Sequence, residues 1–348
     1  MIENSGATYF AALNTGQGFI SYFDNVFGGI DTVYVIKGGA GTGKSRLMRQ
    51  ISAKAKGKGV MVEEFLCSSD PASLDGIIIP RLGVAMLDGT APHVYEPKLI
   101  GARERLVDLG AFLDCEVLRE KREEIEALVA AKKRRYKQVY EYLKVISIYD
   151  GAIDRAAEKA LDADKMQRAV QKSALWLKKS ESYEKKVRIR SAVSTQGHVV
   201  LNTYALKAKK RFAIAELCRY GRRYLSKLLE LSEREGISVE VSYDPFCPEC
   251  PDALYYPESG VAFYIGSDPR FDETLINMRR FANDTLLRPY KPEIRAIGRL
   301  KGATEGGMTY DHTSIVKLHF ALEEIYSKAM DFGLKERLTD KLIKEIFK

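Results

Sequence analysis

The residues at positions 38–45 combine the types and the spacing that phosphate binding requires. They read Gly-Gly-Ala-Gly-Thr-Gly-Lys-Ser and fit the pattern G-x-x-x-x-G-K-[ST]. Glycines let successive backbone N–H groups curve around a chain of phosphates, and a helix that begins at the loop adds the positive end of its dipole. We therefore expect a nucleotide to be bound by Gly38, Gly39, Ala40, Gly41, Thr42, Gly43, Lys44, Ser45 and Arg46.

Three side chains are candidates for the chemistry of this site. Lys44 would reach the β- and γ-phosphates, and the hydroxyl of Ser45 would bind Mg²⁺. A second Mg²⁺ ligand is expected at the end of a buried apolar strand, and Asp88 follows the apolar run 83–87. We predict a site for ATP or GTP with Mg²⁺, in which Lys44 and Asp88 are catalytic and Ser45 and Asp88 bind the metal. No residue of the sequence stands out as a general base for water.

The segments around the loop have the patterns of a strand and a helix. Residues 32–36 are β-branched or aromatic, and a helical pattern begins at Arg46. Elsewhere we expect a hairpin over residues 8–30, strands over 60–66 and 83–90, a loop or short helix over 68–76, and long charged helices from about 104 to 185.

The sequence contains an internal repeat. When residues 59–92 are compared with residues 236–269, 11 of the 34 positions are identical, whereas about two matches are expected from average residue usage. We therefore predict an α/β protein formed by a tandem duplication of P-loop NTPase lobes, each followed by a helical segment. The predicted divisions are 1–105 (lobe with the intact loop), 106–186 (basic helices), 187–290 (degenerate lobe) and 291–348 (linker and helices).

The two copies differ where the chemistry is expected. Residues 216–224 stand opposite the phosphate loop, but they keep one glycine and lack the Lys-Ser pair, and Ile265 replaces Asp88. Asp75 recurs as Asp252 in the second copy, which favours a role in the fold. Asp70, replaced by Cys247, is a further candidate near the site. We predict one nucleotide site and one degenerate, pseudo-NTPase lobe.

The block 67–93 resembles a known family. It reads C-S-S-D-P-x-S-L-D-G-x-I-I-P-x-L-G-V-A-x-L-D-G-T-A-P-H, and with the loop it looks like the poorly characterised bacterial ATPase-like proteins built from tandem P-loop units. The resemblance covers nearly the whole chain and implies a cytoplasmic P-loop NTPase, with Thr90 and His93 close to the site. Family members carry a P-loop in both halves, and this sequence departs from them in the second.

Composition sets the class and the compartment that we expect. The chain has 348 residues, long enough for two cores, and five cysteines, an odd number that argues against a disulfide framework. No apolar run approaches the length of a membrane span, and the N-terminus lacks the basic region of a signal peptide. We therefore expect a cytoplasmic protein without a membrane span.

The positive charge is concentrated in one region. The formal net charge is +8, and residues 119–190 alone hold 20 Lys+Arg against 12 Asp+Glu. Such a surplus is found where proteins contact nucleic acid or an anionic surface. Because acidic residues are interleaved, a solvated helical face with many ion pairs is the competing interpretation.

The cysteines suggest a second, separate site. Cys247 and Cys250 form one CxxC pair, and Cys218 lies in the loop opposite the phosphate loop. If these loops meet at one edge of the sheet, the three thiols could bind zinc, with Asp252 or a histidine as the fourth ligand. The alternatives are small buried residues or a redox pair.

These observations leave three functions open. The leading one is a Mg²⁺-dependent ATPase or NTP-driven switch, helped by a cation from the second lobe (Arg222, Arg223, Arg279 or Arg280). The second is a small-molecule kinase in which Arg103 and Arg105 act from a lid. The third is a non-catalytic nucleotide sensor whose basic helices dock on nucleic acid or on a protein partner.

Overall fold

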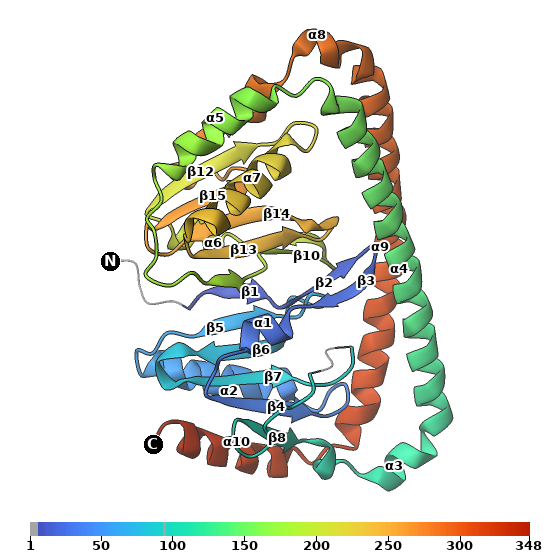
Figure 1. Cartoon of the computed structure of the whole chain (residues 1–348). Coiled ribbons are helices and arrows are strands. Elements are labelled where there is room, and N and C mark those ends of the chain that lie inside the picture. The colour runs from blue at the N-terminus through green and yellow to red at the C-terminus, as the bar shows by residue number, and fades with distance from the viewer. Residues whose placement is uncertain (1–5, 93–94) are drawn as a thin grey trace.

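The computed structural model describes residues 6–92 and 95–348 and contains two six-stranded mixed sheets. Figure 1 shows the two sheets in two lobes, stacked one above the other, with a pair of long helices along one side. The chain is thus an α/β protein. The first sheet has the order β1 (Thr8–Phe10), β5 (Glu63–Leu66), β6 (Leu74–Ile79), β7 (Val84–Asp88), β4 (Thr32–Lys37) and β8 (Glu104–Asp108).

The second sheet repeats this order and the strand directions. In both sheets the third strand is antiparallel to its two neighbours, and the other pairings are parallel. Its strands are β9 (Lys185–Val187), β13 (Val239–Asp244), β14 (Cys247–Tyr256), β15 (Val261–Ile265), β12 (Lys210–Ala215) and β16 (Thr274–Asn277). Each half also has a hairpin, β2 (Ala12–Thr15) with β3 (Gly18–Ser21) and β10 (Ser191–Ser194) with β11 (Gly197–Val200).

Two predictions about the elements are wrong. The α-helices expected from about 104 to 185 begin at Cys115 and end at Ala174, because Glu104–Asp108 form strand β8. The segment 68–76 was expected to be a loop or short helix, but the chain enters strand β6 at Leu74, and all six residues of β6 are buried. A short apolar run that is buried on both faces shows neither the alternation of a half-buried strand nor the period of a helix. Pairing with β5 and β7 therefore decides its structure.

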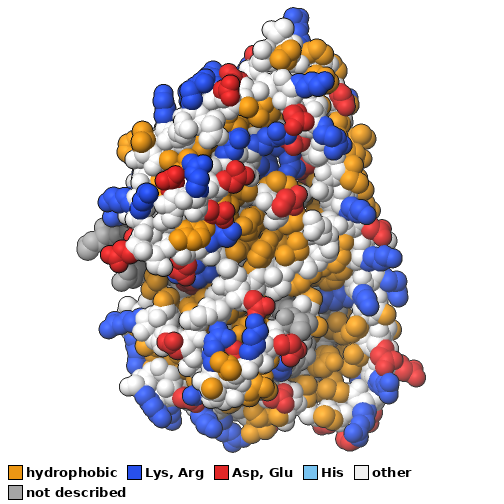
Figure 2. Space-filling view, viewed as in Figure 1, with side chains coloured by type: hydrophobic (Ala, Val, Ile, Leu, Met, Phe, Trp, Pro, Cys, Tyr) orange, Lys and Arg blue, Asp and Glu red, His pale blue; other side chains and the backbone are white. Residues whose placement is uncertain are grey.

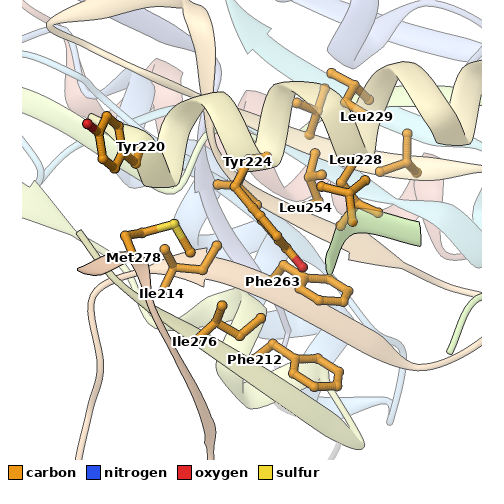
Figure 3. Packing of buried hydrophobic residues seen from close by; sticks show 14 of the residues in the cluster. Phe212, Ile214, Tyr220, Tyr224, Leu228, Leu229, Leu254, Phe263, Ile276 and Met278 are labelled. Atoms are coloured by element: carbon orange, nitrogen blue, oxygen red, sulfur yellow. The ribbon is translucent and has the colours of Figure 1, made fainter. Parts of the chain in front are cut away.

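Each lobe has a helix that follows the fifth strand of its sheet, the neighbour of the edge strand. These are α2 (Lys44–Gly57) after β4 and α7 (Tyr220–Glu235) after β12. Figure 3 shows Tyr220, Tyr224 and Leu228 of α7 packed with Phe263 and other buried residues of the sheet. The short helices are α1 (Phe23–Phe27), α3 (Cys115–Glu120), α6 (Thr203–Lys207) and α8 (Asp284–Leu287), with 3₁₀ turns at Pro80–Leu82, Gly110–Phe112, Met278–Phe281 and Arg288–Tyr290.

The two longest helices form an antiparallel pair. They are α4 (Arg122–Glu158) and α9 (Lys291–Lys328), which lie side by side along both lobes (Figure 1). Lys132 of α4 contacts His319 of α9, and Asp150, farther along α4, contacts Lys301 at 2.9 Å. We call this pair the helical hairpin.

Because α4 and α9 run antiparallel along both lobes, the helix that follows each of them packs on the other lobe. Helix α5 (Ala163–Ala174), which follows α4, packs on the second lobe, where Ser173 Oγ lies 2.5 Å from the hydroxyl of Tyr224. Helix α10 (Phe332–Ile346), which follows α9, packs on the first lobe, where Gln50 Nε2 of α2 donates to Glu336 at 2.8 Å. Helix α10, the end of the predicted segment 291–348, is therefore part of the first lobe's packing, and the first sheet's last strand, β8, crosses the predicted boundary at residue 105.

This exchange predicts that a C-terminal residue stabilises the N-terminal lobe. Leu342 of α10 is buried in one cluster with Leu47 and Ile51 of α2. Leu342→Ala should lower the free energy of unfolding by about 2–4 kcal/mol, because it leaves a cavity in that cluster. Urea denaturation would measure the change. Leu300→Ala on the exposed face of α9 is the control, and an equal, small change in both variants would contradict the packing.

Candidate functional site

The glycines of the loop are placed where other residues would be strained. The loop connects β4 to α2, and Gly41 and Gly43 have φ values of +68° and +84°. This left-handed region is open to glycine at little energetic cost. Gly43 is also the residue that caps the N-terminus of α2. The G-x-G-K spacing thus allows the chain to turn from the strand directly into the helix.

Lys44 and Asp88 meet at the end of this loop. Strands β4 and β7 are parallel neighbours, and Asp88 is in register with Ile36, at the end of the strand that leads into the loop. Lys44 Nζ lies 3.6 Å from Asp88 Oδ2 and donates hydrogen bonds to the carbonyl oxygens of Gly38 at 2.9 Å and Gly39 at 2.7 Å. Two residues 44 positions apart are therefore held together by strand pairing.

Thr90 and Ser45 complete the polar part of the site. The backbone N–H of Thr90 donates to Asp88 Oδ1 at 2.8 Å, and its hydroxyl donates to the carbonyl of Gly38 at 3.0 Å. Ser45 Oγ accepts a hydrogen bond from the N–H of Leu74 at 3.0 Å. Thr90 thus joins the carboxylate to the loop. His93, the other residue implied by the resemblance, lies outside the described residues.

These residues line a cavity of about 1520 Å³ between the first lobe and the helical hairpin. Helix α4 contributes four cationic side chains to its wall, and α9 contributes His319 and Glu323. Helix α9 also touches the loop itself, since a Cβ on Gly39 would lie 2.7 Å from the ring of Tyr326. The cations from α4 are Lys132, Lys133, Arg134 and Lys137.

The remaining acidic candidates have different surroundings. Asp70 accepts hydrogen bonds from Ala72 N at 3.1 Å and Ser73 Oγ at 2.8 Å, and so shapes its own turn. Asp75 is buried in the cavity wall, where burial and this carboxylate raise the pKa of the Cys67 thiol. Its counterpart Asp252 instead pairs with a buried arginine of the second half. Asp75 is thus closer to the site than a purely structural role requires.

The corresponding loop of the second lobe is shorter and holds a carboxylate of its own. Four residues, 216–219, separate β12 from α7, against six in the first lobe. Glu216 Oε1 accepts from the N–H groups of Leu217 at 2.9 Å and Gly221 at 2.8 Å, at the N-terminus of α7. Its other oxygen pairs with Arg222 at 3.0 Å, while burial raises the pKa of Glu216. A side-chain anion therefore uses the N–H groups that a phosphate would need.

The arginines expected to act on the first site are bound elsewhere. Arg222 pairs with Glu216 and Asp244, and Arg223 donates to Asp154 at 2.9 Å. In the part of the chain that the structure describes, none of the predicted arginines lines the cavity, so this prediction is wrong. The others are Arg279, paired with Asp284; Arg280, over the ring of Phe281; Arg103, paired with Glu104; and Arg105, paired with Glu345.

The structure does not bring the three predicted zinc ligands together. Cys247 and Cys250 form a disulfide, and Cys218 is a free thiol. Within residues 6–92 and 95–348, the group with the spacing of metal ligands consists of Cys247, Glu249 and Cys250, without Cys218. Asp252, the proposed fourth ligand, is engaged by Arg190 at 3.3 Å. Because a metal binds the thiolate, the disulfide would have to be reduced first.

At its start, the basic stretch 119–190 forms local ion pairs. Arg119 pairs with Glu116 and Lys121 with Glu124 within one turn of helix. On the face of the molecule in Figure 2, Lys and Arg side chains are interspersed with Asp and Glu. Four cations of this stretch, all from α4, line the cavity.

Comparison of the chain with protein-family models, with curated proteins and with solved structures found no match. Among the described helices, none is long and apolar enough to cross a membrane. The resemblance to tandem P-loop ATPase-like proteins therefore remains a prediction from the sequence.

The second loop leads to a prediction about stability. Glu216→Ala removes the acceptor of two backbone N–H groups and of Arg222, which should lower the free energy of unfolding by about 1–3 kcal/mol. Urea denaturation would measure it, with Glu230→Ala on the exposed face of α7 as the matched control. A change of less than about 0.5 kcal/mol in Glu216→Ala would contradict the assigned role.

Proposed function

We propose that the N-terminal lobe binds a nucleoside triphosphate with Mg²⁺ and acts as an NTPase or NTP-driven switch. The observation that carries the proposal is the meeting of Lys44 and Asp88, 3.6 Å apart, at a glycine loop that opens helix α2. A cation, a carboxylate and loop N–H groups at the carboxyl ends of parallel strands are the set that phosphoryl transfer uses.

Each residue then has a defined task. The loop N–H groups and the N-terminus of α2 would hold the phosphates. Lys44 would exchange the carbonyls of Gly38 and Gly39 for phosphate oxygens, because an anion is the stronger acceptor. Ser45 and Asp88 would hold Mg²⁺, which neutralises the charge that develops on the phosphates when it is bound.

The second lobe is proposed as a pseudo-site, so that one nucleotide binds per chain. Its matching strand order supports descent from the same unit. Its loop is two residues shorter and already holds the carboxylate of Glu216 on two N–H groups. A phosphate at this position would meet a like charge instead of free donors.

A switch is favoured over a kinase by the contacts of the loop. Tyr326 and Glu323 of α9 lie directly against Gly39 and Gly41, so a change in the loop is felt by the helical hairpin. Arg103, the expected lid residue of a kinase, donates to the carbonyls of Phe27 and Ile30 within the lobe. A protein partner or nucleic acid that docks on the basic helices would then bind differently depending on which nucleotide occupies the loop.

The first test is the loss of binding in Lys44→Ala. Because the variant lacks the cation that meets the β- and γ-phosphates, the Kd for Mg·ATP or Mg·GTP should rise at least about 100-fold. Calorimetric titration gives the Kd and the number of nucleotides per chain, expected to be one. Lys54→Ala on the exposed face of α2 is the control. Unchanged binding by Lys44→Ala, or two nucleotides per chain, would refute the assignment.

The second test separates the two carboxylates of the site. Asp88→Asn should raise the Mg²⁺ concentration needed for half-maximal nucleotide binding about tenfold or more, since an amide is a poorer ligand than a carboxylate. Asp75→Asn should have the smaller effect, because its carboxylate lies in the wall beside Cys67. Titration with Mg²⁺ at fixed nucleotide measures both. The reverse ranking would move the metal role to Asp75.

A further inference from the structure

A half-buried lysine of the helical hairpin, Lys132, lines the cavity and has a different kind of partner from its counterpart in the other half. Lys132 of α4 lines the cavity, and its Nζ lies 3.1 Å from His319 Nδ1 of α9. Burial lowers the pKa of Lys132, and the charge of Lys44 lowers it further, while Cys67 and Glu323 oppose the shift. Two ammonium groups therefore approach the same space from opposite sides, Lys44 from the loop and Lys132 from the hairpin.

The internal repeat supplies a comparison within the same chain. Two isolated backbone bridges are equivalent in the two halves: Leu113 pairs with Met330, and Ala282 pairs with Leu161. Ala282 lies 169 positions after Leu113, and Met330 lies 169 positions after Leu161, so corresponding residues of the two halves are 169 positions apart here. The same offset relates α4 to α9 residue by residue. Lys132 then corresponds to Lys301, which is one of the residues that tie the hairpin together beside the second lobe.

The partners of the two lysines differ in charge. Lys301 Nζ donates to both carboxylate oxygens of Asp150, at 2.9 and 3.2 Å. The residue that corresponds to Asp150 is His319, which offers Lys132 a ring nitrogen in place of a carboxylate. Among the described residues, no carboxylate lies within ion-pair distance of Lys132, and Glu323 is 3.3 Å from His319 Nε2 instead. A half-buried cation without a carboxylate partner is stabilised by an anion that enters the cavity.

The neighbouring positions show the same asymmetry. Lys133 and Lys137 of α4 line the cavity of the first lobe. At the corresponding positions α9 has Gly302 and Gly306, both exposed and without a neighbour for a Cβ within 4 Å. The additional positive charge is thus found beside the loop that keeps its glycines, and it is missing beside the loop that holds Glu216.

We propose that Lys132, oriented by His319, binds the terminal phosphate of the nucleoside triphosphate and makes the site prefer triphosphate over diphosphate. This inference rests on the proposed function. Lys44 would hold the β- and γ-phosphates from the loop, and Lys132 would hold the γ-phosphate from the hairpin. Loss of the γ-phosphate would then remove one contact between the nucleotide and α4, which is how the hairpin would sense the state of the nucleotide.

The test compares affinities for ATP and ADP. Calorimetry with Mg²⁺ and either ADP or the non-hydrolysable β,γ-imido analogue of ATP gives the ratio of the two Kd values. Lys132→Met should weaken binding of the ATP analogue about 10- to 100-fold, the effect of a lost hydrogen bond between charged groups, and change ADP binding less than about twofold. His319→Gln should give a smaller loss in the same direction, because it removes the orientation but not the charge.

Matched variants make the outcome decisive. Lys301→Met, the corresponding change beside the second lobe, should leave the ratio unchanged although it breaks the ion pair with Asp150. Lys132→Arg, which keeps the charge, should retain most of the preference and guards against misfolding of the Met variant. An unchanged ratio in Lys132→Met, or an equal loss for both nucleotides, would overturn the inference. If Lys44→Ala still abolishes binding in that case, the proposed function stands alone; if the parent binds neither nucleotide, both fall together.

Discussion

The packing of α10 on α2 is the contact on which the arrangement of the site depends. Lys335 of α10 is fully buried, and its ammonium is bound by Gln50 of α2 at 3.0 Å and by Glu336 at 3.0 Å. Its aliphatic stem lies 3.5 Å from a Cβ position on Gly43, at the point where the loop becomes a helix. With α10 fixed on the lobe, α9 must pass over the loop, and the helical hairpin becomes the second wall of the cavity. A buried charge that is shared between elements is costly to disrupt, so this contact resists rearrangement.

The second half shows what the same topology does without the glycine loop. The strands and the helix keep their places, but the loop is closed by the Glu216 carboxylate and by an ion pair with Arg222. Lys301 and Asp150 likewise neutralise each other there. Glu216 and Lys301 of the second half thus have fixed partners, whereas Lys132 of the first half lines a cavity. The halves share their strand order and differ mainly in which charged side chains have a partner of opposite charge.

Local patterns predicted the parts of the site that are close in sequence. The glycine spacing from Gly38 to Ser45 and the apolar run that ends at Asp88 each carry their own signal, and the repeat shows where both are lost. The hairpin residues could not be assigned in this way. Lys132 is one lysine in a basic run, and its importance depends on a partner, His319, that is 187 residues away. The arginines of the second lobe failed as candidates because carboxylates such as Asp154 and Asp244, distant in sequence, already bind them.

The exchange of α10 also affects how the chain folds during synthesis. The core of the N-terminal lobe includes Met330 and Leu342 besides its own strands. A lobe that waits for a helix made at the far end of the chain cannot complete its core as it leaves the ribosome, although N-terminal domains commonly do. At about 5–20 residues per second, the roughly 240 residues between Asp108 and Phe347 take on the order of 12–50 s to make. During that time the part of this cluster that α10 covers is exposed, so the glycine loop is synthesised early and is among the last motifs to be enclosed.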